Sequence, residues 1–182
     1  MTVSLELLPG YDHPAAILSL FTEYTRMLVS HDPSFQIYLD IQHYEDETRD
    51  LEAKYGQPEG RLYLALWEGK SAGCIALRKL DEQRCEMKRL YVRPAFRGHK
   101  IGDTLVDRVL QDAKAIGYRH MLLDTLPFLE GAIHLYRKRG FFEIPCYNDS
   151  PMETTIFMQY DLQRSPDRNN RPAAAAAGPS SL

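Results

Sequence analysis

The sequence lacks the residues that stabilise disulfide-rich or metal-bound folds. Its 182 residues include three cysteines, Cys74, Cys85 and Cys146, which lie far apart and form no C-x-x-C pair. This spacing predicts a reducing compartment, no disulfide framework and no metal site. No stretch approaches the roughly 18 apolar residues of a membrane span, and the first residues carry no basic flank before an apolar run. We therefore expect neither a membrane segment nor a secretory signal, and a cytoplasmic location.

The sequence also lacks an excess of positive charge. It carries 22 Lys and Arg against 25 Asp and Glu, a formal net charge of −3 at pH 7. Nucleic-acid-binding proteins present a basic face that neutralises phosphates, so this composition argues against a nucleic-acid partner. The residues after Leu162 are rich in arginine and proline and contain an alanine run at 173–177. They have no apolar set that could form a core, so we expect 163–182 to be a disordered tail.

The remaining residues, 1–162, have the length of one domain with a full core. Alternating apolar and polar residues predict strands, and apolar residues three or four apart predict helices. We expect strands at 2–8, 61–67, 71–80, 84–92, 119–125, 141–146 and 154–162. We expect helices at 14–30, 44–55 and 101–116, and another that ends at 139. This order is typical of a mixed sheet covered by helices.

The segment from Tyr91 to Gly102 has the pattern of a strand, a basic loop and the start of a helix. Four of its side chains are cationic or can become so: Arg93, Arg97, His99 and Lys100. Unpaired N–H groups collect at a helix N-terminus, where they and the helix dipole attract phosphates. An ordinary strand-loop-helix joint with solvated charges explains the same pattern, and spacing alone leaves both interpretations open.

This loop resembles the acyl-CoA pyrophosphate loop of the GNAT N-acetyltransferases, whose pattern is Arg/Gln-x-x-Gly-x-Gly/Ala. Arg97 stands at the first position and Gly102 at the last, whereas Lys100 replaces the middle glycine. A second segment, 132–141, is similar to the family's signature of an alanine followed by Leu-Tyr-x-x-x-Gly-Phe. Between the two motifs there is room for one helix and one strand, as in that family. The resemblance covers about 61–162 and, more loosely, the helices before it.

The resemblance implies the GNAT acyltransferase fold, an α/β arrangement with a mostly antiparallel central sheet and flanking helices. One splayed parallel pair would be formed by 84–92 and 119–125. The resemblance also implies acetyl-CoA as cosubstrate, without a metal. The pantetheine arm would pair with the backbone of Leu90, Tyr91 and Val92, as an added strand does. The pyrophosphate would lie over the loop residues Arg97, Gly98, His99, Lys100, Ile101 and Gly102.

Lys100 is the point at which the loop departs from the family pattern. A left-handed backbone at this position would cost a lysine roughly 1–2 kcal/mol. We expect instead that Lys100 lies in the first helical turn with ordinary backbone angles, where its amide still serves the phosphates.

Acetyl transfer to an amine benefits from an acid that protonates the departing thiolate. The resemblance suggests Tyr136, in the second motif, as that acid beside the CoA sulfur. Tyr136 also shares a helical face with Leu129, Ala132 and Ile133. A core aromatic whose hydroxyl finds an ordinary partner is therefore the alternative.

The same reaction needs a base that collects the proton of the amine. We expect Glu86, on the strand that enters the site, because some family members that modify lysine carry a glutamate there. Pairing of Glu86 with Lys88 or Arg78 across the sheet is the alternative.

These features predict an acetyl-CoA-dependent N-acetyltransferase in which a primary amine attacks the thioester directly, in one ternary complex. Neither motif contains a cysteine, so an acetyl-cysteine intermediate is not expected. The alternative is a catalytically weak CoA-binding sensor or interaction module. We expect a small-molecule amine as acceptor, because the acidic residues between 40 and 52 favour a cation, although that run is equally a solvated helix face. A lysine-type acceptor and a homodimer remain open.

Overall fold

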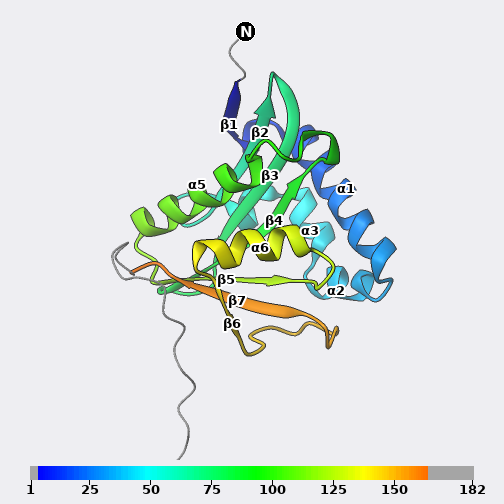
Figure 1. Ribbon diagram of the computed structural model, residues 1–182, viewed down its shortest axis with the longest axis vertical. Helices are drawn as coiled ribbons and strands as arrows, with labels where there is room; N and C mark the ends of the chain where they lie inside the picture. The colour runs from blue at the N-terminus through cyan, green and yellow to red at the C-terminus, as the bar shows by residue number, and fades with distance from the viewer. Residues whose placement is uncertain (1–3, 164–182) are drawn as a thin grey trace, which may run out of the picture.

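The computed structural model describes residues 4–163, which fold around one twisted sheet of seven strands (Figure 1). The strands are β1 (Leu5–Pro9), β2 (Arg61–Trp67), β3 (Lys70–Lys79), β4 (Arg84–Val92), β5 (His120–Thr125), β6 (Phe142–Ile144) and β7 (Ile156–Asp161). The helices are α1 (Pro14–His31), α2 (Phe35–Ile41), α3 (Tyr44–Arg49), α4 (Leu51–Tyr55), α5 (Ile101–Ile116) and α6 (Glu130–Arg139). Two short 3-10 turns, η1 (Gly10–Asp12) and η2 (Pro94–Phe96), precede α1 and α5. Of the predicted tail, all but Gln163 lies outside the described residues.

The sheet contains one parallel pair among antiparallel neighbours. The strand order is β1-β2-β3-β4-β5-β7-β6, and only β4 and β5 run parallel. Their ladder covers three positions, from Arg84 opposite His120 to Glu86 opposite Leu122. Beyond Glu86 the ladder stops, and the two strands diverge towards their carboxyl ends (Figure 1). The predicted mixed sheet with one splayed parallel pair is therefore confirmed.

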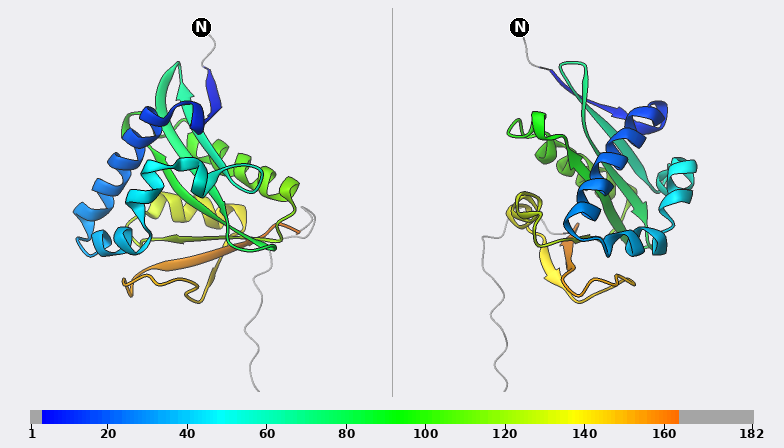
Figure 2. Two further views of the ribbon diagram at one scale, coloured as in Figure 1. Left: turned by 180° about the vertical axis from the view of Figure 1, so that it is seen from behind. Right: turned by 90° about the vertical axis from the view of Figure 1, so that its right-hand side faces the viewer.

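Helices cover both faces of this sheet, as the two views of Figure 2 show. α5 and α6 lie on one face, and α1 to α4 lie on the other. Because side chains alternate along a strand, β2 supplies both cores. Tyr63 and Ala65 join the cluster beneath α5, whereas Leu62 and Leu64 join the cluster beneath α1.

The two long helices form where the apolar spacing predicts them. α1 begins with Pro14, whose fixed φ suits the first helical turn. Its buried residues lie on one stripe: Ile17, Leu20, Phe21, Thr25 and Leu28. α5 buries a similar stripe: Ile101, Leu105, Val106, Val109, Leu110 and Ala113. α5 ends at Gly117, whose φ of +107° favours glycine.

The region before β2 differs from the prediction of a single helix at 44–55. The chain forms α3 and α4, which meet at Asp50 with non-helical angles (φ −141°, ψ 89°). The Asp50 carboxylate accepts a hydrogen bond from the Ala53 amide at 3.0 Å, a capping geometry that aspartate prefers to a helix interior. The seven-residue α2 was not predicted, although its buried Phe35, Tyr38 and Leu39 have helical spacing.

No helix within residues 4–163 is both long enough and apolar enough to cross a membrane.

Candidate functional site

The divergence of β4 and β5 is accompanied by a cleft of about 570 Å³. Its walls come from α1, the end of β4, the β4–α5 loop with the first turn of α5, and α6 with the loop before it. The side near α1 includes Tyr24, Met27 and His31, and the side near α6 includes Leu129, Leu135 and Tyr136. Two segments far apart in the sequence, the basic loop and the second motif, thus face one cavity.

The loop before α5 presents free backbone donors at one end of this cleft. The N–H groups from Gly98 to Asp103 donate no hydrogen bond to any residue of the described range, 4–163. Gly98 has a φ of +85°, which glycine adopts without strain. These amides lie at the N-terminus of a sixteen-residue helix, where the dipole adds partial positive charge. The arrangement is suited to bind an anion such as a phosphate.

The expectation of ordinary helical angles at Lys100 is wrong. Lys100 is the residue before the first turn of α5 and has left-handed angles (φ 58°, ψ 23°). The loop thus takes the conformation that a glycine at this position would take, and the lysine bears the strain of about 1–2 kcal/mol. Its side chain is exposed, and its carbonyl accepts the first helical bond, from the Thr104 amide at 3.0 Å.

Most of the predicted cofactor residues line the cleft. They are Leu90, Tyr91, Val92, Arg97, Gly98, Lys100, Ile101 and Gly102. His99 is not among the lining residues, because its ring stacks on Trp67 with 4.3 Å between the ring centroids. The His99 side chain therefore packs against the β2–β3 hairpin, and the loop contributes its backbone at this position.

Two arginines of the loop have different partners. Arg93 pairs with Glu23 of α1 (Nη2 to Oε1, 2.8 Å) and donates to the Ser71 carbonyl at 2.7 Å. It therefore ties the start of the loop to α1 and β3. Arg97 lines the cleft, donates from Nε to the Val92 carbonyl at 3.2 Å, and remains exposed. Arg97 is the loop arginine placed to meet an anionic ligand.

Tyr136 combines a core ring with a hydroxyl that faces the cleft. Its ring is buried and packs against Phe141, with 5.6 Å between the ring centroids. Its hydroxyl makes no hydrogen bond with any other residue of 4–163, and the residue lines the cleft. Burial raises the pKa of Tyr136, and Tyr24 and Asp124 raise it further. The hydroxyl thus stays protonated and can donate a hydrogen bond or a proton into the cavity.

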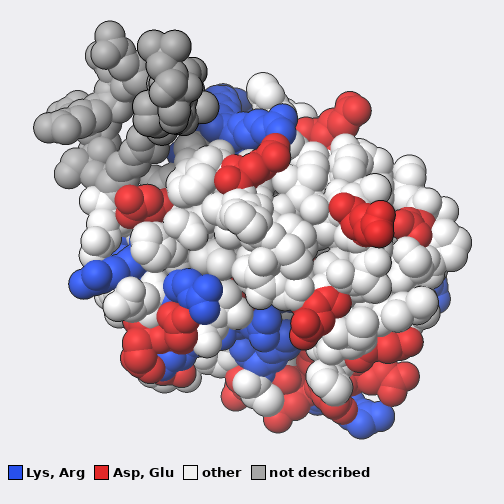
Figure 3. Space-filling model, turned by 90° about the horizontal axis from the view of Figure 1, so that it is seen from below, with Lys and Arg blue, Asp and Glu red and all other residues white. Residues whose placement is uncertain are grey.

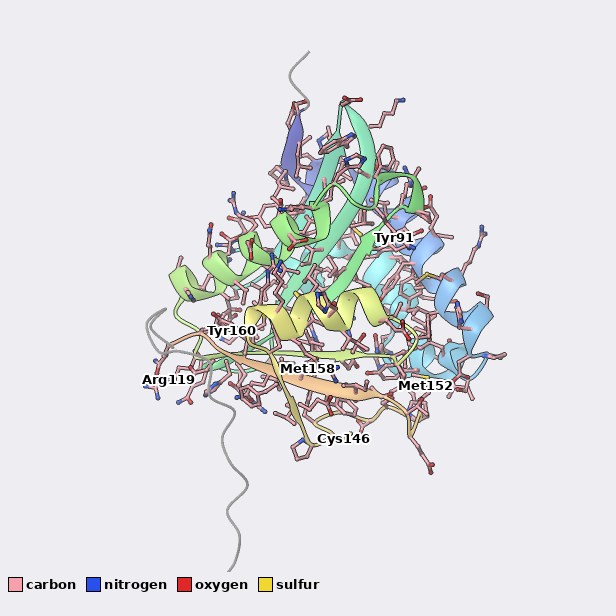
Figure 4. All side chains as sticks on the ribbon, viewed as in Figure 1. Tyr91, Arg119, Cys146, Met152, Met158 and Tyr160 are labelled. Carbon is pink, nitrogen blue, oxygen red and sulfur yellow. The ribbon has the colours of Figure 1, made fainter. Side chains whose placement is uncertain are left out.

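A second, smaller cavity of about 40 Å³ adjoins the cleft and shares Tyr24 and Leu129 with it. Its walls come from α1, α2, β4, β5 and the segment before β7. Met152, which lines this cavity, lies near α2 and far from Tyr91 at the end of β4 (Figure 4). Burial raises the pKa of Tyr24, at the junction of the two cavities, to about 12. Tyr24 therefore also stays protonated.

Asp124 places a carboxylate at this second cavity. It lies near the end of β5 and accepts hydrogen bonds from the Tyr38 hydroxyl and from Asn148 Nδ2, the latter at 2.9 Å. Burial would raise the pKa of Asp124, but nearby Lys88 and the two hydrogen bonds outweigh it and hold the pKa below its ordinary value. Asp124 is therefore ionised at neutral pH.

Lys88 and Arg89, adjacent on β4, both line the second cavity. Neighbouring strand residues normally point to opposite faces of a sheet. Here the β3–β4 register shifts between Cys74 and Ala76, and Arg89 has a φ of +58°. This bulge re-aims the side chains and brings two cations to one cavity.

Arg89 is fixed by a buried ion pair with Glu47 of α3. Nε and Nη2 of Arg89 lie 2.7 and 2.9 Å from the two carboxylate oxygens of Glu47. Glu47 also accepts hydrogen bonds from Lys54 and from the Tyr55 hydroxyl. Burial opposes ionisation, but Arg89 outweighs it and lowers the pKa of Glu47 to about 2. Glu47, which the sequence placed on an acidic helix face, is in fact a buried structural residue.

Glu86, the predicted base, lines neither cavity. One carboxylate oxygen lies 2.5 Å from Arg78 Nε. The other accepts the Tyr147 hydroxyl at 2.9 Å and lies 3.8 Å from Lys88 Nζ. These contacts match the ion pairing that the sequence left open as the alternative.

Sequence reasoning missed Tyr24, Lys88 and Asp124 as cavity residues. The available signal was a charged residue inside an otherwise apolar strand: Asp124 follows Met121, Leu122 and Leu123. Such a residue needs a partner or a solvent-filled space. For Tyr24 there was no local signal, because it falls on the apolar stripe of α1.

Within the described residues, no group of three or more His, Cys, Asp or Glu side chains is arranged to hold a metal ion. Cys74 and Cys85 are buried, and Cys146 is exposed on the loop after β6, away from Tyr91 (Figure 4).

Comparison with known proteins gives consistent results. The sequence model of the acetyltransferase (GNAT) family matches residues 19–141. An uncharacterized N-acetyltransferase of Schizosaccharomyces pombe is 37% identical over 132 residues, which cover 71% of this chain and 81% of that protein.

Solved structures show the same fold. A GNAT-family acetyltransferase of Staphylococcus aureus Mu50 has a TM-score of 0.69 at 20% identity, covering 88% of this chain and 100% of that one. A GNAT-family acetyltransferase of Elizabethkingia anophelis, solved with acetyl-CoA bound, has a TM-score of 0.54 at 22% identity, covering 86% and 97%. The expected fold is therefore confirmed.

Proposed function

Because the chain belongs to the acetyltransferase (GNAT) family, we propose that it transfers an acetyl group from acetyl-CoA to the primary amine of a small molecule. One observation carries the proposal. A single cleft joins the free amides of the β4–α5 loop to the Tyr136 hydroxyl. The second cavity, which we assign to the acceptor and call the acceptor cavity, adjoins this cleft at Tyr24 and Leu129. An anion-binding end, a proton donor and a second cavity are what this reaction requires.

The residues of the cleft fit acetyl-CoA. The loop amides and Arg97 are suited to its pyrophosphate. Leu90, Tyr91 and Val92, beyond the point where β4 leaves β5, are suited to pair with the amides of the pantetheine arm. Bound there, acetyl-CoA would supply a thioester carbon open to attack by an amine. The acetyl-CoA held by the structurally similar protein of Elizabethkingia anophelis supports this assignment.

In the proposed transfer, the amine nitrogen bonds to the acetyl carbon and the carbon–sulfur bond breaks. Tyr136, which its raised pKa keeps protonated, donates a proton to the departing sulfur. Asp124 holds the incoming ammonium, which loses two protons in becoming the amide nitrogen. The first passes to water before the attack, because the lowered pKa of Asp124 makes it a weak base, and the second, lost after the attack, restores Tyr136. No cysteine is among the residues that line either cavity, which supports direct attack in a ternary complex.

We assign Glu86 a positioning role rather than the role of base. It was expected to act as the base, and its contacts with Arg78, Tyr147 and Lys88 favour a positioning role instead. In that role Glu86 holds Lys88 at the wall of the acceptor cavity.

The alternative, a CoA-binding sensor without turnover, depended on Lys100. Because the Lys100 backbone takes the left-handed angles of a glycine, the loop amides keep the arrangement expected of the family pattern. We therefore favour the enzyme.

The proposal is tested by the release of free CoA thiol from acetyl-CoA in the presence of amines, including amino acids, polyamines, aminoglycosides and lysine peptides. We expect thiol release that depends on at least one small amine. Binding of acetyl-CoA without turnover of any acceptor would favour the sensor, and turnover confined to peptides would contradict the small-molecule acceptor.

A further inference from the structure

Two opposite charges face the acceptor cavity without touching each other. Lys88 comes from β4 and Asp124 from β5, where the two strands diverge. No ion pair forms between them within 4.0 Å, although Lys88 lies close enough to lower the pKa of Asp124. A ligand that carries a positive and a negative group a short distance apart would complement this pair.

The Lys88 ammonium is nearly buried and has unused hydrogen-bond donors. Only 5% of its side chain is exposed, and Nζ makes no hydrogen bond with any residue of 4–163. Its nearest carboxylate oxygen, on Glu86, lies at 3.8 Å, beyond hydrogen-bonding distance. The Glu86 oxygens are already engaged by Arg78 and Tyr147. An anionic ligand group in the cavity would supply the hydrogen-bond acceptors that this nearly buried ammonium lacks.

Asp124 lines the second cavity, which adjoins the cleft at Tyr24 and Leu129. It influences the pKa of both Tyr24 and Tyr136, two tyrosines that line the cleft. An ammonium held by Asp124 would therefore lie near the hydroxyl assigned to the departing sulfur.

We infer that the acceptor is an amino acid, with its carboxylate bound by Lys88 and its amino group held between Asp124 and the cleft. This inference rests on the proposed function and names its acceptor class. The cavity volume of about 40 Å³ is close to that of a water molecule, roughly 30 Å³. A cavity of this size suits the carboxylate end of the acceptor, and the rest of the molecule would extend into the adjoining cleft. Because Lys88 and Asp124 line the same small cavity, an α- or β-amino acid, whose two charged groups lie close together, fits them.

A purely cationic acceptor fits this cavity less well. Glu47, the buried member of the acidic run, is saturated by Arg89, Lys54 and Tyr55 and is not free to bind a cation. A polyamine would also bring a further positive charge towards Lys88, which is unfavourable at low dielectric.

The test compares acceptors that differ only in the carboxylate: phenylalanine with 2-phenylethylamine, histidine with histamine, and lysine with cadaverine. Thiol release from acetyl-CoA gives kcat and KM for each. We expect the amino acid of at least one pair to exceed its amine in kcat/KM by tenfold or more, the scale of one charge-assisted hydrogen bond. Turnover of the amines equal to or above that of the amino acids would overturn the inference and leave the proposed function intact. No turnover of any acceptor would count against both.

Lys88→Met tests the residue itself. It should raise KM for the amino acid about tenfold or more, should change kcat/KM for the matched amine much less, and should leave KM for acetyl-CoA unchanged. Lys70→Met, at the exposed start of β3, is the matched control and should change none of these quantities. An equal loss for amino acid and amine would contradict a carboxylate-binding role. If Lys88→Met does not fold, Lys88→Arg keeps the charge and should retain the preference for the amino acid.

Discussion

Lys100 holds an unfavourable backbone conformation that gathers the amides of its neighbours towards the cleft. Its φ of +58° costs a residue with a Cβ roughly 1–2 kcal/mol, and its exposed side chain makes no hydrogen bond within 4–163 that would offset this cost. The amides from Gly98 to Asp103 need this turn, so the strain belongs to the ligand-binding loop rather than to the core.

Lys100→Gly should therefore stabilise the protein without disturbing the loop. We expect the free energy of unfolding to rise by about 0.5–1 kcal/mol, since relief of the left-handed strain is partly offset by the greater freedom of glycine in the unfolded chain. Denaturant unfolding measures this change. Glu68→Gly is the matched control: Glu68 has a φ of +49° in the β2–β3 turn, so its stability should rise similarly.

Acetyl-CoA affinity, measured by calorimetry, should change at most a few-fold in Lys100→Gly, because the backbone donors remain. Binding that strengthens tenfold would mean that the lysine hinders the cofactor, and would favour the sensor. Lower stability would contradict the strain argument.

Tyr136 differs from a purely structural tyrosine in having no partner for its hydroxyl within the described residues. Tyr136→Phe should lower kcat by about 100-fold, the scale of a positioned proton donor. The thermal midpoint and the acetyl-CoA affinity should change little, because the ring still packs against Phe141. Tyr160→Phe alters the other tyrosine that packs on Phe141, outside both cavities, and should leave kcat unchanged. A lower midpoint with normal kcat would make Tyr136 a core residue only.

At the scale of elements, Glu47 connects α3 to its neighbours β4 and α4. Its carboxylate, with none of its side chain exposed, joins α3 to the bulge of β4 through Arg89 and to α4 through Lys54 and Tyr55. Removing one member of such a cluster leaves a buried charge without its partner, which costs about 3–5 kcal/mol. Because Arg89 also lines the acceptor cavity, this cluster fixes the shape of that cavity.

Acid should weaken this connection in a defined pH range. The pKa of Glu47 is about 2 in the folded protein against an ordinary 4.5, so the unfolded chain takes up the proton first. The stabilisation is complete above pH 4.5 and is lost as the pH falls towards 2. Glu47→Gln should be less stable at pH 7 and should show a shallower decline of the unfolding free energy between pH 5 and 3. Parallel declines in the two proteins would refute this role for Glu47.

At the scale of the whole molecule, the cofactor-binding part of the site could be predicted from the sequence, whereas the acceptor cavity could not. The loop from Arg97 to Gly102 and the motif around Tyr136 are each a continuous stretch of sequence. A short motif can therefore reveal each of these two parts of the cleft. The acceptor cavity combines Tyr38 of α2, Lys88 of β4 and Asp124 of β5, and Asn148 of the loop after β6 donates a hydrogen bond to Asp124. No local pattern joins these residues, and the β4 bulge that re-aims Lys88 and Arg89 has no glycine to reveal it.

The same holds for the fold. The periodicity predicted the sheet strands and the two long helices, because their apolar stripes extend over several turns or alternations. It failed between Pro33 and Tyr55, where capping by Asp50 and tertiary contacts of Glu47 decide the structure. Figure 3, viewed from the β6–β7 side, shows an uncharged central area with charges of both signs around it, and so gives no support to a polyanionic partner on that face.

The central claim is that the β4–α5 loop binds acetyl-CoA through its backbone at the start of α5. Calorimetry with acetyl-CoA on Gly102→Glu tests it most directly. A Cβ at Gly102 would lie 3.4 Å from Leu135 Cδ1, an ordinary contact, so the variant should fold. Its carboxylate would occupy and repel the phosphate site. Gly102→Ala is the matched control, with the Cβ but no charge. We predict that Gly102→Glu keeps its thermal midpoint and shows no binding, whereas Gly102→Ala still binds. Unchanged affinity in a folded Gly102→Glu would contradict the account.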